Sequence, residues 1–267
     1  MIRISERQLH HLMARLSERA MTVLRFLAQQ RFATTSHLAR LLRPHHASPT
    51  SALRQTSRLT NHLATLHLIR ALTRRIGGMR AGSGATIWHL TEPGHRLITR
   101  HDADIGTPTR RRWHEPSMNF LTHTLAITET RITIEETARH SHFTIRHIEP
   151  EPTCWRSHLG PYGQPEWVKP DLSLITETDG YQDHWWCEID LATENPARIT
   201  TKARAYHHHY QAGTEQATRG IFPRVLWITS HPARKQQLHH ILTSDTTLPA
   251  GMHSAITLEE VKDVLTN

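Results

Sequence analysis

Two carboxylates in the segment 168–191 have the spacing of a metal site. The segment reads VKPDLSLITETDGYQDHWWCEIDL, and two β-prone runs in it flank the dipeptide Asp179-Gly180. Asp-Gly between such runs predicts a hairpin with a two-residue turn. The numbers of paired residues then sum to 359, so that Asp171 lies opposite Glu188. Because like charges directly opposite each other destabilise a sheet, this register predicts a cation between the two carboxylates.

The cation that suits such a site is a divalent metal with oxygen ligands, and we expect Mg²⁺ or Mn²⁺. Asp190 is a candidate third ligand. Glu129 is a candidate fourth, with Glu135 and Glu136 as competitors on the same predicted helix. The hairpin therefore predicts a metal-dependent hydrolase. The plain alternative is that Asp171 only follows Pro170 in a turn.

The same register places Lys169 opposite Asp190. One interpretation is that the Lys169 amine reaches the metal site. The other is a cross-strand ion pair without a catalytic role.

Bulk composition narrows the class of protein. A chain of 267 residues with 37% hydrophobic content predicts one large domain or two modest ones. No run approaches the roughly 18 apolar residues of a membrane helix, and the N-terminus lacks the apolar stretch of a signal peptide. Cys154 and Cys187 are the only cysteines, which excludes a disulfide framework and a cysteine-based zinc site. We expect a cytoplasmic protein.

Charge is unevenly distributed along the chain. Residues 1–116 hold 19 Lys and Arg against 6 Asp and Glu, whereas residues 117–267 hold 13 against 18. Such asymmetry predicts a basic nucleic-acid-binding module joined to an acidic one. The alternative is a general arginine bias in composition.

The basic part has the pattern of a winged helix. Helical spacing appears at 19–32, 36–42 and 49–67, and strands are predicted at 69–76 and 86–91. The third helix would enter the major groove of double-stranded DNA, with Leu53 on its buried face. The predicted DNA-binding residues lie on that helix, in the hairpin and in a basic linker: Arg54, Gln55, Arg58, Asn61, His62, Arg74, Arg75, Arg80, Arg110, Arg111 and Arg112. A winged helix that contacts protein is the alternative.

The remaining chain predicts an α/β core with a central mixed sheet. Before the hairpin at 168–191, this part of the chain predicts a helix at 117–140, a strand at 142–149 and a loop at 150–166. After the hairpin it predicts helices at 195–212, 231–243 and 258–265, which alternate with strands at 224–229 and 253–257. Asn195 is the expected N-cap of the helix after the hairpin, with Pro196 at its first position. We therefore expect an α+β protein with a winged helix at 1–100, a linker at 101–116 and a second domain at 117–267.

The second part resembles the restriction-endonuclease-like PD-(D/E)xK nucleases. Pro170-Asp171 matches the "PD", and Glu188-Ile189-Asp190 stands at the "(D/E)xK" position, with aspartate where lysine is expected. Lys202 on the following helix, or Lys169, would have to supply that amine.

The whole pattern is similar to the replication-relaxation family of plasmid and integrative-element proteins. The resemblance rests on the segment 123–126 and on Asp171, Glu188, Asp190, Lys202 and Tyr206. It implies a role on plasmid or mobile-element DNA, in replication initiation or conjugative mobilisation. A second copy of the chain is a further candidate partner.

Three functions remain open at this point. The first is metal-dependent nicking of DNA, either hydrolytic or through a tyrosine nucleophile, for which Tyr206, Tyr210 and Tyr162 are candidates. The second is a non-catalytic DNA-binding replication factor or regulator that retains a degenerate nuclease fold. The third is a toxin-like or defence nuclease.

Overall fold

The chain divides into two compact units, and the division falls inside a helix. The computed structural model describes residues 5–73, 85–102 and 115–266. One unit extends to Ile132 and the other begins at Thr133, within helix α6 (Met118–Ala138). The linker predicted at 101–116 falls largely on residues 103–114, which lie outside the described residues. Six predicted DNA-binding residues lie outside the described residues: Arg74, Arg75, Arg80, Arg110, Arg111 and Arg112.

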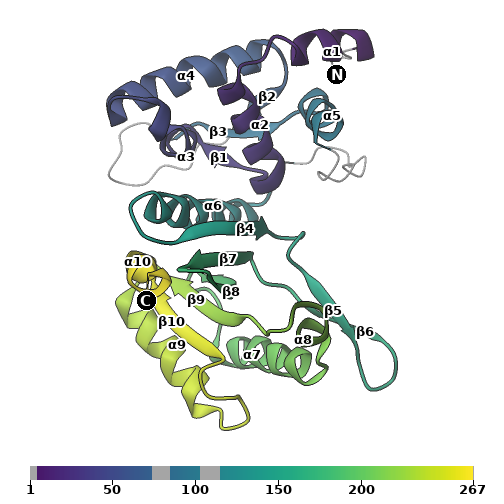
Figure 1. Cartoon of the computed structure of the whole chain (residues 1–267), viewed down its shortest axis with the longest axis vertical. Helices are drawn as coiled ribbons and strands as arrows, with labels where there is room; N and C mark the ends of the chain where they lie inside the picture. The colour runs from purple at the N-terminus through teal and green to yellow at the C-terminus, as the bar shows by residue number, and fades with distance from the viewer. Residues whose placement is uncertain (1–4, 74–84, 103–114, 267) are drawn as a thin grey trace. The chain divides into compact units, whose positions relative to one another are not determined.

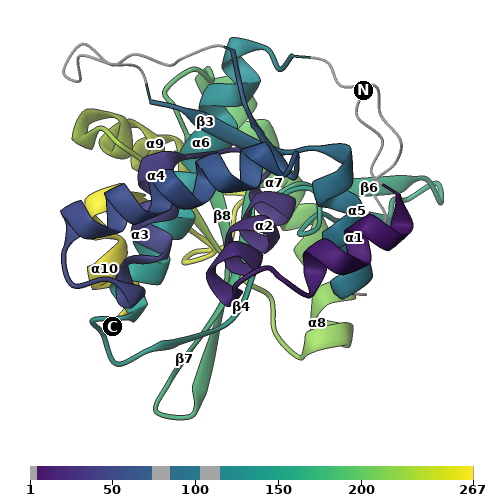
Figure 2. The same ribbon diagram turned by 90° about the horizontal axis from the view of Figure 1, so that it is seen from above.

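The first unit contains the three predicted helices in order, followed by two antiparallel strands, and it has further elements that were not predicted. Its elements are α1 (Glu6–Met13), α2 (Glu18–Gln30), β1 (Ala33–Thr34), α3 (Thr35–Leu41), η1 (Arg43–His45), α4 (Pro49–Thr65), β2 (Ile69–Ala71), β3 (Ile87–Leu90) and α5 (Glu92–His101). The strands form one sheet in the order β1-β3-β2, with antiparallel pairing. Figure 2 shows α3 beside α4, and α1 beside α5. Helix α1 was not predicted, and its N-cap is Ser5.

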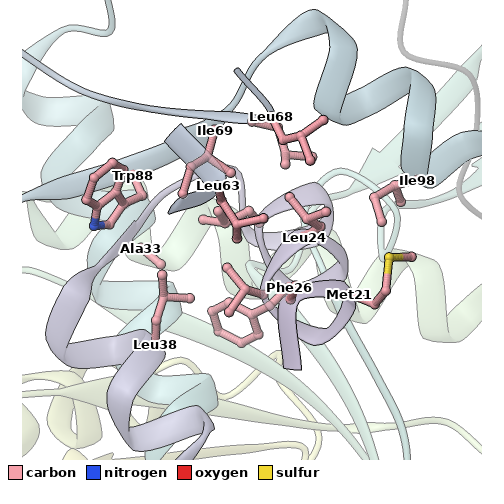
Figure 3. Packing of buried hydrophobic residues seen from close by; sticks show 14 of the residues in the cluster. Met21, Leu24, Phe26, Ala33, Leu38, Leu63, Leu68, Ile69, Trp88 and Ile98 are labelled. Atoms are coloured by element: carbon pink, nitrogen blue, oxygen red, sulfur yellow. The ribbon is translucent and has the colours of Figure 1, made fainter. Parts of the chain in front are cut away.

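An apolar core holds most of these elements together. Leu24 and Leu27 of α2, Leu38 of α3 and Leu63 of α4 are fully buried in it. Figure 3 shows Leu24, Leu38 and Leu63 converging with Trp88 from the sheet. Burial of such side chains is the main favourable term in folding, so the hairpin and the three helices stabilise one another.

Helix α4 begins and buries its face as its sequence dictates, with one exception. Ser48 caps its first turn and Pro49 occupies the first helical position. The buried residues are Ala52, Thr56, Thr60 and Leu63. Leu53 was predicted to face inward but is 47% exposed, because it lies about 100° around the helix from Ala52.

The second unit is built on a five-stranded mixed sheet, as predicted. The strand order is β10-β9-β8-β7-β4, with β8, β9 and β10 parallel and the other pairs antiparallel. The elements are β4 (Thr144–Pro150), β5 (Arg156–Leu159), β6 (Pro165–Val168), β7 (Leu172–Thr178), β8 (Tyr181–Asp190), α7 (Pro196–Gln211), α8 (Thr214–Arg219), β9 (Arg224–Thr229), α9 (Pro232–Ser244), β10 (His253–Thr257), η2 (Leu258–Glu260) and α10 (Val261–Leu265). Helix α9 packs on β9 and β10 (Figure 1). Together the units make an α+β protein.

The hairpin register is confirmed. Leu172 pairs with Cys187 and Thr178 with Tyr181, so the residue numbers sum to 359 as predicted. Asp179 and Gly180 form the turn with positive φ angles of 50° and 83°. Positive φ at both central residues is the geometry of a type I′ turn, which matches the twist of the flanking strands.

Two parts of this unit differ from prediction. Residues 150–166 were expected to be a loop, but they contain β5 and the start of β6, which pair with each other in a separate two-stranded sheet. Gly160 to Gly163 make the turn between them. Helix α8 was also missed, because Gly213 in the left-handed conformation ends one helix and caps the next. Within the described residues, no helix has the length and apolarity that crossing a membrane demands.

An ion pair connects the first half of α6 to α3. Arg40 Nη1 lies 2.6 and 2.7 Å from the two carboxylate oxygens of Glu129, and His37 Nε2 lies 3.1 Å from one of them. Partial burial raises the pKa of Glu129, but these hydrogen bonds outweigh it and lower the pKa to about 2. Glu129 therefore stabilises the first unit and is not available as a metal ligand.

We predict that Glu129→Gln destabilises the first unit by about 1 kcal/mol at pH 7, a figure that allows for the partial exposure of the carboxylate. A depressed folded-state pKa contributes stability above pH 4.5 that is lost as the pH falls towards 2. The difference from wild type should therefore shrink between pH 5 and pH 3 in urea titrations, whereas Glu18→Gln, on an exposed carboxylate, should change little at either pH. A constant difference across this range would contradict the role of the ion pair.

Candidate functional site

Glu188 is the centre of the candidate site. It lies near the end of the central strand β8 and is only 2% exposed. Its Oε2 accepts a hydrogen bond from Lys202 Nζ at 2.8 Å, and its Oε1 accepts one from the Tyr206 hydroxyl at 2.5 Å. A carboxylate with this burial requires such partners, because the loss of hydration of an unpaired charge costs several kcal/mol.

Helix α7 positions both donors. Asn195 caps the helix through the amide of Arg198, and Pro196 occupies the first helical position, as predicted. Lys202 and Tyr206 are four residues apart and therefore lie on one face, one above the other. The Tyr206 ring packs 5.6 Å from that of Trp186, which fixes the hydroxyl towards Glu188.

Tyr210, one turn further on, does not join them. It is 42% exposed, and its ring lies against Phe222 at 5.3 Å. The predicted common face of the three residues thus holds for Lys202 and Tyr206 only.

Asp171 is the second carboxylate of the site. It is buried immediately before the first residue of β7, where its amide donates to the Cys187 carbonyl at 3.0 Å. Its Oδ2 accepts a hydrogen bond from the Ile189 amide of β8 at 2.7 Å. The side chain thus replaces a main-chain acceptor in the ladder, which holds the carboxylate beside Glu188 as the register predicted.

The two carboxylates and the lysine influence one another electrostatically. Burial, and next the charge of Asp171, raises the pKa of Glu188 to about 7, against the opposing effect of Lys202. Burial lowers the pKa of Lys202, but the charges of Glu188 and Asp171 outweigh it and raise that pKa, so the amine stays protonated. Burial and the neighbouring Glu188 raise the pKa of Tyr206 well above its usual value.

Asp190 does not belong to this cluster, which corrects its predicted role as a metal ligand. Arg234 of α9 contacts it through two hydrogen bonds, Nε to Oδ1 and Nη2 to Oδ2, both 2.9 Å long. Its Oδ1 also accepts the Ala192 amide at 2.7 Å. Both carboxylate oxygens of Asp190 are therefore used to hold α9 and the start of the β8–α7 connection.

The predicted contact between Lys169 and Asp190 is likewise absent. Lys169 is exposed, and its Nζ lies 4.8 Å above the ring of Trp155. The hairpin pairing does not extend this far, because Pro170 has no amide to donate and the preceding residues form β6, which pairs with β5. Lys202, and not Lys169, is thus the amine at the site.

The donor set is small but suits one kind of metal. Of the three predicted ligands in the second unit, Asp171 and Glu188 come together and Asp190 does not, and within the described residues no three His, Cys, Asp or Glu side chains are arranged to bind a metal ion. Mg²⁺ commonly uses one or two carboxylates and completes its six ligands with water and substrate phosphate. Two adjacent carboxylates meet that requirement, whereas they would be too few for a closed structural site.

A second candidate site is the outer face of α4. Arg54, Gln55, Arg58, Asn61 and His62 are all exposed, as predicted for residues that contact DNA. The helix contains no acidic residue over Pro49–Thr65. A helix with this composition presents donors and positive charge without repelling phosphate.

Sequence reasoning missed two residues around Glu188. Arg234 follows Asp190 by 44 positions, and no local spacing signals their contact. Glu194 lies 3.7 Å from Lys202 and 2.9 Å from Arg198. The sequence does contain a signal for the contacts of Glu194, because this residue directly precedes the Asn195 cap and acidic groups favour helix N-termini.

Comparison with known proteins gives one positive result. The family model described as Replication-relaxation matches residues 24–225, about three-quarters of the chain. The match includes α4, Asp171, Glu188, Lys202 and Tyr206. The corresponding comparisons with curated proteins and with solved structures give no match.

We predict that Asp190→Ala destabilises the second unit by about 3 kcal/mol or more, because it leaves the buried Arg234 guanidinium without its counterion. Asp183→Ala is the matched control: it removes the same side chain from the same strand, where the pair with Arg224 is half exposed. We expect that control to change the free energy of unfolding by less than about 1 kcal/mol. Equal effects of the two substitutions in chemical denaturation would contradict the structural role of Asp190.

Proposed function

The chain belongs to the replication-relaxation family, and on that basis we propose that it binds the DNA of a plasmid or integrative element and nicks or processes it with a divalent metal. Membership of the family implies a role in the replication or relaxation of such an element. We infer the metal-dependent nicking from the site around Glu188. The main observation behind this inference is that Nζ of Lys202, on helix α7, lies 2.8 Å from Oε2 of Glu188. An amine is thus present beside Glu188, although Asp190 occupies the strand position at which PD-(D/E)xK nucleases have their lysine.

Each residue of the cluster has a distinct part in this proposal. Asp171 and Glu188 would hold Mg²⁺ or Mn²⁺, which when bound polarises a phosphodiester and lowers the pKa of a bound water. Lys202 stays protonated beside them and can stabilise the additional negative charge that develops on the phosphate. The remaining partner, Tyr206, holds Oε1 of Glu188 and so orients the carboxylate.

Hydrolysis is favoured over a covalent tyrosine intermediate at this site. Tyr206 is 2% exposed, and its raised pKa opposes formation of the phenolate that a nucleophile requires. Tyr210 packs on Phe222, away from Glu188. Tyr162 is 95% exposed in the β5–β6 turn and belongs to no carboxylate cluster among the contacts described above.

A specific observation also supports a non-catalytic alternative. Both oxygens of Glu188 already accept hydrogen bonds, from Lys202 and from Tyr206, so the carboxylate is satisfied without a metal. A replication factor or regulator that binds DNA and uses this network only for stability would have the same contacts. Metal-dependent nicking distinguishes the two.

DNA recognition is assigned to the first unit. The exposed face of α4 carries Arg54 and Arg58 one turn apart, with Gln55 and Asn61 beside them. Arginine can pair with guanine edges and phosphates, and amides can pair with adenine, so this face suits the major groove of double-stranded DNA.

We predict that the protein nicks supercoiled plasmid with Mg²⁺ or Mn²⁺, and that Asp171→Ala, Glu188→Gln and Lys202→Met each reduce the rate about 100-fold or more. Tyr206→Phe should retain nicking within about tenfold, because it removes one orienting hydrogen bond but no charge. The conversion of supercoiled to open-circular DNA on gels measures both.

The control for this experiment is Asp183→Ala, which alters a carboxylate of the same strand outside the site. Unchanged nicking by the Asp171 and Glu188 variants would remove the site assignment. Absence of nicking in the wild type with every metal, together with intact DNA binding, would establish the non-catalytic alternative.

We also predict that Arg58→Ala weakens binding to duplex DNA and reduces the slope of log K against log salt by about 1, because one phosphate contact is lost. Fluorescence anisotropy over a salt series measures this slope. Arg146→Ala, an exposed arginine of the second unit paired with Glu177, is the matched control and should leave the slope unchanged. The same slope in the Arg58 variant and wild type would exclude α4 as the duplex-binding face.

A further inference from the structure

The second unit carries a short two-stranded arm outside its five-stranded sheet. The β5–β6 arm, residues 156–168, is a two-stranded hairpin separate from the five-stranded sheet, and Figure 1 shows it projecting from that sheet. One of its faces packs on α7. Val168 is buried there, and His158 Nδ1 lies 2.9 Å from Nδ1 of the fully buried His209.

The opposite face of the arm exposes large apolar side chains. Trp167 is 51% exposed and lies opposite Ser157, and Leu159 is 74% exposed. Tyr162, in the turn, is 95% exposed. Exposed aromatic groups gathered on one short element are uncommon on a protein surface without a binding role.

We propose that this outer face binds an unpaired stretch of single-stranded DNA, with bases stacked on Trp167 and Tyr162, and leads it to Asp171; this proposal rests on the proposed function. The arm continues directly into the site. Trp167 precedes Asp171 by four residues, so their Cα atoms are at most about 14 Å apart. Lys169 lies between them in sequence, is exposed, and offers a cation to the DNA backbone.

Single-stranded DNA fits this surface better than other occupants. Stacking on aromatic rings with cations along the backbone is the usual way in which proteins bind single strands without sequence preference. An apolar protein partner or a second copy of the chain would bury Lys169 together with the aromatic groups and remove its hydration. Duplex DNA offers no free base faces for stacking.

The test measures binding without chemistry. Wild-type full-length protein is titrated into a fluorescein-labelled oligo(dT) of about 15 nucleotides in EDTA, within the usual range of site sizes, and anisotropy is followed. Trp167→Ala should weaken this binding about fivefold to about a hundredfold. Trp167→Phe should retain most of the affinity, since a ring remains for stacking.

Two controls make the result specific. Tyr181→Ala removes an 80%-exposed aromatic residue from the other hairpin, roughly 20 Å along β8 from Glu188, and should leave oligo(dT) binding unchanged. Binding of Trp167→Ala to a blunt duplex should also equal that of wild type, because α4 is assigned to duplex DNA. Unchanged circular dichroism spectra would show that the variants fold.

Several results would overturn the proposal. These are no binding of oligo(dT) by the wild type, equal binding by Trp167→Ala, or an equal loss on duplex DNA. Concentration-dependent dimerisation that disappears in Trp167→Ala, measured by sedimentation, would assign the arm to a second copy instead. The binding assay contains EDTA and therefore does not depend on a metal. If Trp167→Ala weakens oligo(dT) binding but the wild type shows no nicking activity with any metal, the role of the arm is supported and only the metal-dependent nicking is rejected.

Discussion

The burial of the Glu188 carboxylate is the constraint on which the second unit depends. A charge that is 2% exposed in a central strand must receive hydrogen bonds from nearby groups, and both of its donors come from α7. Helix α7 must therefore begin within a few residues of the end of β8 and present its Lys202 face to the strand. The Asn195 cap and Pro196 set that beginning.

Local sequence signals were sufficient for this part of the molecule because each acts over a short distance. The Asp179-Gly180 turn determines the pairing of β7 with β8, and the pairing brings Asp171 to Glu188. The helix start and the four-residue spacing then bring Lys202 and Tyr206 together. A turn, a cap and a helical period are properties of a few neighbouring residues, which explains why the register and the shared face of Lys202 and Tyr206 were predictable. The choice between Lys202 and Lys169 as the amine was not, because it depends on where the pairing of the hairpin ends.

The parts that were not predictable depend on distant contacts or weak patterns. The guanidinium of Arg234 reaches Asp190 because α9 packs on the sheet, and nothing in residues 231–235 identifies that partner. Strands β5 and β6 have four residues each, lie in a Gly- and Pro-rich segment, and are stabilised partly by contacts with α7. The pairing of Glu129 with Arg40 depends similarly on the packing of α3 against α6 within the first unit. An acidic residue on a predicted helix has no local feature that distinguishes a metal ligand from an ion-pair partner.

Glu188 and Asp190 belong to one acidic motif but bind different cations. The residues are two apart on one strand, so they point to the same face, roughly 6–7 Å from each other. Two buried carboxylates at that distance would repel each other unless each had its own cation. The cations come from different helices, Lys202 from α7 and Arg234 from α9.

Arginine binds Asp190 through two hydrogen bonds and stays charged, which suits a permanent structural contact. Lysine offers a single ammonium group, and its 33% exposed side chain would let it turn towards the phosphate in the proposed reaction. The aspartate at the expected lysine position therefore does not by itself argue against chemistry at Glu188, because its charge is balanced independently by Arg234.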